Sequence, residues 1–377
     1  MALPPPPAGA LLTIDLAALV ANWRHIGAAS GAAQVAAVVK ADAYGLGARP
    51  VVRALAAAGC RLFCVAHLEE ALALADLLPQ GGALGVLNGL VPGAEGACAR
   101  AGLRPVLNTL AQARRWQAEA ATQHRPLPAF LQVDSGMARL GVSPAEAALL
   151  ATDTAFRAAV PLAGLISHLA CADVPEDPAN ARQLASFAAT AAHFPGVARS
   201  LANSGGCLMG PAFGGDIARP GLALYGAQPA IHPDPALRPV VRLDARVIQI
   251  RDLPAGAGAG YGLSWQAPAP ARLAALAVGY ADGWPRSLSN RGFAAFGGQI
   301  LPIAGRVSMD STLVDITALA PDALAEGDLV ELIGPNRPIG QVAAEAGTIA
   351  YEILTGLGPR YARRYLGAAP LATEQMP

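Results

Sequence analysis

The chain has 377 residues, and its 27 basic and 27 acidic side chains give a net charge of zero. Charged residues are only 14% of the composition, so no strong surface field favours a nucleic acid or a membrane as partner. Apolar stretches are interrupted by proline, glycine or charge before they could span a bilayer, which leaves a small metabolite as the expected partner.

The beginning of the chain disfavours a secretory signal peptide. The stretch MALPPPPAGA has no basic residues and contains four consecutive prolines, which predict an irregular lead-in. The five cysteines form no CxxC pair, so that reduced and mostly buried thiols are expected rather than disulfides or a metal site. These features predict a cytoplasmic protein without a bound metal.

Strand-like and helical segments then alternate along two thirds of the chain. LLTI predicts a strand and LAALVANWRHIG a helix, and from residue 35 to about 225 short apolar runs alternate with alanine-rich stretches. This pattern is typical of a parallel sheet with crossover helices. Eight runs predict a (β/α)8 barrel domain over residues 12–236. The runs are 35–40, 61–66, 83–88, 104–108, 129–134, 162–168, 200–203 and 216–220.

The rest of the chain predicts a smaller, mainly β domain. The proline-rich segment 230–239 indicates a stiff linker. Beyond it, five strand-like stretches follow one another without a long helix between them, and Gly297-Gly298 predicts a hairpin turn. We place this second domain at residues 237–377, with residues 1–11 added to it.

Polar side chains close most of the barrel runs, where a barrel enzyme carries its active site. Among them, Lys40 is the only lysine of the chain, and the remaining basic residues are all arginines. An amine can lose its proton, act as a base and condense with an aldehyde, none of which a guanidinium does. Five apolar residues precede Lys40, which disfavours a solvated surface position. The other closing residues are Asn88, Asn108, Asp134, His168, Asn203 and Arg219.

Nine motifs, in order over residues 12–365, resemble the alanine racemase family, whose members depend on pyridoxal 5'-phosphate (PLP). They are VVKADAYGLG, VDSGMARLG, LISHLACAD, LANSGG, ARPGLALYG, AGYGLSW, VGYADGWPR, RVSMD and YEILTGLGPR. The resemblance implies a PLP-binding barrel followed by a β domain, and a head-to-tail homodimer with shared sites. The implied reaction interconverts L- and D-alanine by a two-base mechanism on a PLP external aldimine, and thereby supplies or consumes D-alanine for peptidoglycan metabolism.

The resemblance also implies the roles of individual residues. Lys40 would hold PLP and act as one base, and Tyr261 of the partner subunit would be the second, because racemisation needs a base on each face of a planar carbanion. His168 would support that tyrosine, and Arg219 would face the pyridine nitrogen and disfavour transamination. PLP would also be bound by Tyr44, Arg139, Asn203, Ser204, Gly221, Leu222 and Tyr351. Arg139, Met309 and Asp310 would contact the substrate, and Asp173, Tyr280, Arg286 and Arg306 would line an access corridor.

One departure and three alternatives stay open. Many family members carry a carbamylated lysine where this chain has Gln132, so that its amide or a bound anion would have to steady Arg139. A PLP barrel decarboxylase is disfavoured by Arg219, because such enzymes place an acidic residue at the pyridine nitrogen. A non-catalytic PLP-handling barrel would lack the β domain and Tyr261. A racemase of broader specificity, and the physiological direction of the reaction, are not decided by the sequence.

Overall fold

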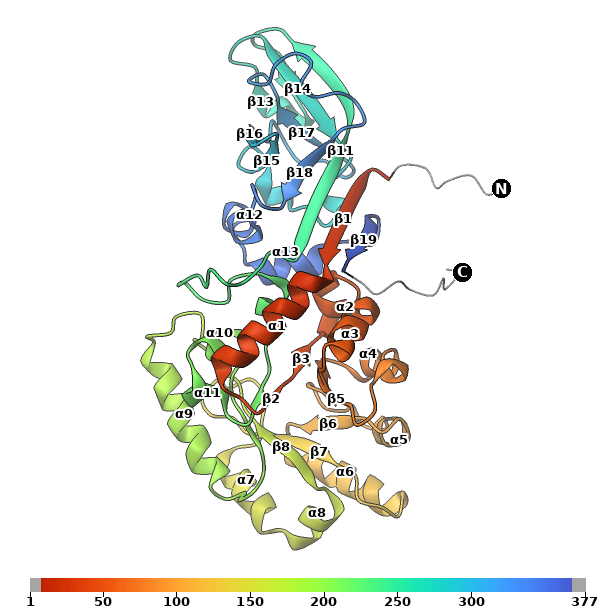
Figure 1. Cartoon of the computed structure of the whole chain (residues 1–377), viewed down its shortest axis with the longest axis vertical. Coiled ribbons are helices and arrows are strands. Elements are labelled where there is room, and N and C mark those ends of the chain that lie inside the picture. Colours follow the sequence, from red (N-terminus) through yellow and green to blue (C-terminus); the bar gives the residue numbers. More distant parts are fainter. Residues whose placement is uncertain (1–7, 368–377) are drawn as a thin grey trace, which may run out of the picture. The chain divides into compact units, whose positions relative to one another are not determined.

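The computed structural model describes residues 8–367, so the proline-rich lead-in and the last ten residues lie outside the described part. The contacts divide the chain into two compact units (Figure 1). One is Leu19–Arg238, and the other combines the first described residues, up to Ala18, with those from Pro239 onward.

Leu19–Arg238 forms the barrel unit. Seven parallel strands run in the order β3-β4-β5-β6-β7-β8-β9, and β10 pairs with β2 in the same sense. Backbone hydrogen bonds from Asp216 N to Arg199 O (2.9 Å) and from Arg219 N to Ala202 O (3.1 Å) join β10 to the β9 segment and complete the circle. The strands are β2 (Gln34–Val35), β3 (Ala37–Val38), β4 (Leu62–Val65), β5 (Ala83–Val86), β6 (Arg104–Leu107), β7 (Ala129–Gln132), β8 (Leu162–Ile166), β9 (Arg199–Ser200) and β10 (Ile217–Ala218).

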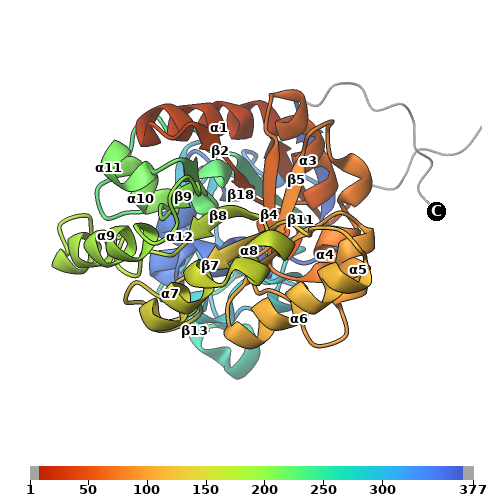
Figure 2. The same cartoon turned by 90° about the horizontal axis from the view of Figure 1, so that it is seen from below.

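Helices follow most of these strands and lie around them (Figure 2). Their starts have local causes: the Thr109 hydroxyl accepts the N–H of Gln112 at the start of α6, and Ser143 and Glu146 form a capping box on α7. The helices are α1 (Leu16–Ser30), α2 (Lys40–Gly45), α3 (Ala48–Ala57), α4 (Leu68–Leu72), α5 (Glu95–Arg100), α6 (Leu110–Thr122), α7 (Pro144–Thr152), α8 (Thr154–Ala159), α9 (Pro178–Ala191), α10 (Ser204–Leu208) and α11 (Pro211–Gly214).

The second unit is rich in antiparallel strands. The long strand β11 pairs with β1, β14 and β18, so that the predicted LLTI strand joins this unit. Gly297 and Gly298 have φ values of 58° and 81° and form the predicted turn between β15 and β16. The strands are β1 (Ala10–Asp15), β11 (Val241–Leu253), β12 (Gly258–Ala259), β13 (Trp265–Gln266), β14 (Ala271–Leu276), β15 (Phe293–Phe296), β16 (Gln299–Pro302), β17 (Thr312–Asp315), β18 (Leu329–Ile333) and β19 (Ala362–Leu366).

Two short helices, α12 (Ile339–Ala346) and α13 (Ala350–Gly356), follow β18 and were not predicted. Within residues 8–367, no helix has the length and apolar character that a membrane crossing requires. All five cysteines are free thiols, and four of them are buried.

Candidate active site

Lys40 lies two residues after the end of β3, at the carboxyl edge of the barrel strands. The N–H of the preceding Val39 donates to the carbonyl of Cys64 on β4 at 2.8 Å, which ties this segment to the next strand. Burial lowers the pKa of the Lys40 amine, and the Arg139 guanidinium lowers it further, while Glu70 and Cys64 act in the opposite direction. The amine is therefore shifted toward the neutral form that a base or nucleophile needs.

The four residues after Lys40 form a left-handed helical turn. Residues 41–44 all have φ between 52° and 58°, and none of them is glycine. Such a conformation costs about 1–2 kcal/mol per residue, so the surrounding contacts must hold it. Within the turn, the Asp42 carboxylate accepts the N–H of Ala48, at the start of α3, at 2.7 Å. The turn brings the buried Tyr44 against Tyr225, with ring centroids 4.6 Å apart.

His168 follows β8 and lies beside other basic groups. Burial lowers its pKa to about 3, and the charges of Arg219, Arg139 and Lys40 contribute in the same direction. His168 is therefore neutral at physiological pH and can act as a hydrogen-bonding group, but not as a cation. Its Nε2 is 3.5 Å from the amide nitrogen of Asn203.

Arg219 is buried at the end of β10, where three neutral oxygens hold its guanidinium. One terminal nitrogen donates to the Ser200 carbonyl at 2.8 Å and to the Ser200 hydroxyl, and the other donates to the Ser167 carbonyl at 2.5 Å. Burial lowers the Arg219 pKa, but a guanidinium keeps its charge through the physiological range.

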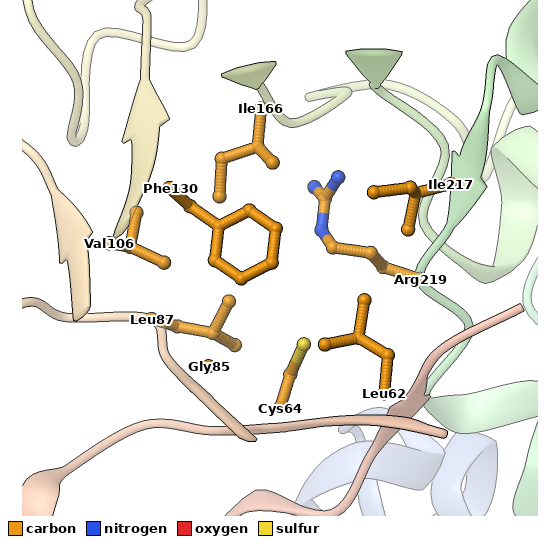
Figure 3. Close-up of a pocket in the computed structure, with 9 residues that line it drawn as sticks. All are labelled: Leu62, Cys64, Gly85, Leu87, Val106, Phe130, Ile166, Ile217 and Arg219. Atoms are coloured by element: carbon orange, nitrogen blue, oxygen red, sulfur yellow. The ribbon is translucent and has the colours of Figure 1, made fainter. Parts of the chain in front are cut away.

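Beneath Arg219 the barrel contains a small cavity of about 10 Å³, the space of roughly one water molecule. Figure 3 shows Arg219 and the ring of Phe130 among the side chains that line it. Its other lining side chains are mostly aliphatic, with the Cys64 thiol among them. Burial raises the pKa of this thiol to about 11, so it stays protonated and does not serve as a nucleophile.

Ser204, Gly221 and Leu222 meet beside Tyr44. The Ser204 hydroxyl oxygen accepts the N–H groups of Gly221 (2.9 Å) and Ala223 (3.2 Å), which leaves its own proton free to donate to an anion. A Cβ at Gly221 would overlap the Tyr44 hydroxyl, so only glycine allows this approach. Gly205 and Gly206 follow Ser204 in α10 and are buried, and the side chain of Asn203 accepts the N–H of Gly206 at 3.0 Å.

Arg139 is exposed on a tightly folded loop after β7. One oxygen of Asp134 accepts the N–H groups of residues 136, 137 and 138, at 2.9–3.1 Å, and shapes this loop. The buried Gln132 amide donates to the carbonyl of Leu140 at 3.2 Å. This hydrogen bond fixes the carbonyl of the residue that follows Arg139.

Tyr261 lies at the tip of the β12–β13 hairpin, and 70% of its side chain is exposed. Gly260 and Gly262 flank it with φ near 70°, which a residue with a side chain rarely adopts. The backbone of Gly262 lies against the Arg306 guanidinium, where an added Cβ would be 3.3 Å from it. The two loops that carry these residues are therefore neighbours.

The other predicted residues of this unit belong to the same group of loops. Tyr280 N donates to Ser308 O at 3.0 Å, which places Tyr280 beside the Met309–Asp310 segment, and both Tyr280 and Met309 are exposed. The Ser289 hydroxyl accepts from Val307 N and donates to Arg286 O, which joins Arg286 to the Arg306 loop. Tyr351, on α13 of the same unit, is also exposed. Asp173 belongs to the barrel unit, where it is exposed after β8.

Two sets of site residues therefore exist, one in each unit. The barrel set combines a lysine shifted toward neutrality with Arg139, Arg219 and a neutral His168, and it favours anionic ligands with a carbonyl group that an amine can attack. Among the described residues, no cluster of side chains could hold a metal ion. The barrel unit is thus that of an enzyme that uses the chemistry of a lysine amine.

Comparisons with known proteins give the family. The family models for the N-terminal and C-terminal domains of alanine racemase match residues 14–229 and 240–365. A catabolic alanine racemase of Agrobacterium fabrum is 51% identical, over 94% of this chain and 92% of its own. An alanine racemase of Acidiphilium cryptum is also 51% identical, over 93% and 97%.

Similar solved structures are also alanine racemases. Alanine racemase of Bartonella henselae, solved with covalently bound pyridoxal phosphate, has a TM-score of 0.91 and 42% identity, covering 96% of this chain and all of the other. The biosynthetic alanine racemase of Pseudomonas aeruginosa has a TM-score of 0.88 and 37% identity, covering 95% and 99%. This chain belongs to the alanine racemase family.

Proposed function

We propose that the protein is an alanine racemase that interconverts L- and D-alanine with PLP as cofactor. The observation that carries the proposal is the only lysine of the chain, which stands at the strand ends of the barrel with a lowered pKa, beside basic groups that suit anions. Family membership supports the same activity.

The residues of the barrel unit fit the cofactor. Lys40 would bind the aldehyde carbon, and Ser204, with its free hydroxyl proton, would bind the phosphate together with Tyr44, Tyr351 and the backbone at Gly221 and Leu222. Arg219 would face the pyridine nitrogen, Arg139 would contact the phenolic oxygen and the substrate carboxylate, and His168 and Asn203 would complete the site. When bound, PLP withdraws electrons from the α-carbon of the amino acid and acidifies its hydrogen.

Proton transfer is then carried out by two residues. The Lys40 amine would accept or return the α-proton on one face, and its lowered pKa favours the basic form. The partner's Tyr261 serves the opposite face through its phenol oxygen. Because Arg219 holds its protons tightly, it would leave the ring nitrogen unprotonated and thereby disfavour proton return to the carbon of the cofactor.

We further propose a head-to-tail homodimer, in which the β domain of each chain contributes Tyr261, Met309 and Asp310 to the partner's site. The exposure of Tyr261 (70%) and Met309 (53%) supports it, because large side chains left in water favour a covering partner. Arg286, Arg306, Tyr280 and Asp173 would line the corridor. The functional domains would be the barrel, 12–236, and the β domain, 237–377 with residues 1–11. The free thiols favour the cytoplasm.

Incubation of the PLP-loaded protein with L-alanine and a panel of other L-amino acids tests the activity, with the D-isomers followed by chiral chromatography. We expect nearly equal amounts of the two alanine enantiomers at equilibrium. Comparable rates with several amino acids would identify a broad racemase instead. Absence of every D-isomer would contradict the proposal.

A further inference from the structure

We propose that Glu70 is a positioning residue for Lys40, because its carboxylate fixes the left-handed turn that begins directly after the lysine. The proposal rests on the role of Lys40 given above. Glu70 lies on α4, the helix that follows β4, and so belongs to the next βα unit of the barrel.

The two oxygens of the Glu70 carboxylate have different partners. Oε2 accepts the N–H groups of Ala66 and His67 at 2.8 and 3.0 Å, and Oε1 accepts the N–H of Ala41 at 2.5 Å. Ala41 is the first residue of the left-handed turn and the neighbour of Lys40 in sequence. One carboxylate therefore links the residue after the lysine to the end of β4.

Capping of α4 explains the contacts of only one of the two Glu70 oxygens. A glutamate three residues after the N-cap commonly accepts the N-cap N–H, and Oε2 does so at His67. Oε1 is not needed for that cap, yet it reaches a residue 29 positions earlier. Because residues 41–44 adopt a backbone that their side chains disfavour, the hydrogen bond at Ala41 holds the strained turn at its lysine end.

The carboxylate also acts on the charge of the amine. Four titratable or charged groups interact electrostatically with Lys40: Arg139, His168, Cys64 and Glu70. The negative charge of Glu70 opposes the lowering of the Lys40 pKa that burial and Arg139 cause. Glu70 thus affects both the position of the Lys40 amine and its pKa.

The unique lysine gives a direct test. Protein grown with lysine labelled by 13C at Cε gives a single resonance, from Lys40, and its chemical shift reports the protonation state of the amine. In cofactor-free protein, we expect Glu70→Gln to lower the titration midpoint relative to the unmodified chain. Glu69→Gln, which removes an exposed charge from the same helix, should leave it unchanged. An unchanged midpoint in Glu70→Gln, or equal shifts in both variants, would overturn the proposal.

A second variant separates positioning from capping. Glu70→Asp keeps the charge and can still cap α4, but its shorter side chain does not span the distance to Ala41. In PLP-loaded protein, we expect kcat to fall about tenfold with a smaller change in KM, whereas Glu69→Asp keeps both. Unchanged kcat in Glu70→Asp would contradict the positioning role. The titration needs no substrate, so it would still support Glu70 if the chiral assay disproved racemase activity.

Discussion

Arg360 and Asp282 form an ion pair in the β domain, with the guanidinium Nε 2.6 Å from one carboxylate oxygen of the buried Asp282. The same guanidinium donates to Asp310 at 2.8 Å, and the other oxygen of Asp282 accepts the N–H of Gly279, the residue before Tyr280. One arginine therefore holds together two segments proposed to serve the partner's site.

Arg360→Gln should free the Asp310 loop and leave the Asp282 carboxylate without its cation. We expect a higher KM for alanine with a smaller change in kcat, and a lower melting temperature, because a buried carboxylate loses a charged hydrogen bond. Arg251→Gln, at an exposed position of β11, is the matched control. Unaltered KM and melting temperature in Arg360→Gln would show that the bridge is dispensable.

Tyr261→Phe removes the phenol and keeps the shape of the side chain. We expect racemisation to fall by about two to four orders of magnitude, the usual contribution of a general acid or base. Lys40 would still exchange the α-hydrogen on its own face, so in D2O one alanine enantiomer should gain deuterium without inverting. Equal loss of exchange from both enantiomers would refute the division of labour between two bases.

The lowered pKa of His168 predicts a loss of stability in acid. The unfolded chain takes up this proton below its ordinary value of 6.5, but the folded chain does so only near pH 3. The contribution of neutral His168 to folding stability is therefore fully present above pH 6.5 and is lost as the pH falls toward 3, by about 1.4 kcal/mol per pH unit.

Urea unfolding of cofactor-free His168→Gln at several pH values measures this pH-dependent loss of stability. Relative to the unmodified chain, the variant should gain stability as the pH falls below 6.5 and show a constant difference above it. His193→Gln, at an exposed position, is the matched control. A constant difference between the unmodified chain and His168→Gln across the whole range would mean that His168 titrates normally.

Arg219→Glu should raise the ratio of transamination to racemisation, because a carboxylate would allow the ring nitrogen to be protonated. The substitution should also destabilise the folded chain by about 1–3 kcal/mol, because the glutamate carboxylate would face the carbonyls of Ser167 and Ser200, which now accept hydrogen bonds from Arg219. Accumulation of pyruvate and the amine form of the cofactor measures the side reaction. A ratio no higher than in the unmodified chain would contradict the assigned role of Arg219.

Much of the fold was predictable because most barrel strands are short buried runs followed by a polar residue. LFCV at 62–65 and AFLQ at 129–132 are buried throughout, as a sheet covered by helices requires. The hairpin at Gly297-Gly298 was predictable because this turn needs two positive φ values. Strand β9 was predicted at 200–203 but is Arg199–Ser200, since the following residues turn into the Asn203 cap of α10.

The left-handed turn and the role of Glu70 were not predictable from the same patterns. Ala41 and Tyr44 carry no signal for positive φ, and the conformation depends on tertiary contacts that the local sequence does not encode. The N-cap of α4 is His67, which is not among the usual N-cap residues, so the sequence did not indicate the capping box. Arg360 lies in the YEILTGLGPR motif, but the carboxylates that it binds belong to Asp282 and Asp310, which are far away in sequence.

The central claim, that Lys40 binds the cofactor, is tested most directly by borohydride fixation. The protein is loaded with PLP, reduced, digested and analysed by mass spectrometry, with Lys40→Arg as the control. We predict one pyridoxyl group per chain, on the peptide that contains Lys40, and none in Lys40→Arg, which should keep its fold. Label on the α-amino group alone, or equal labelling of both proteins, would contradict the account.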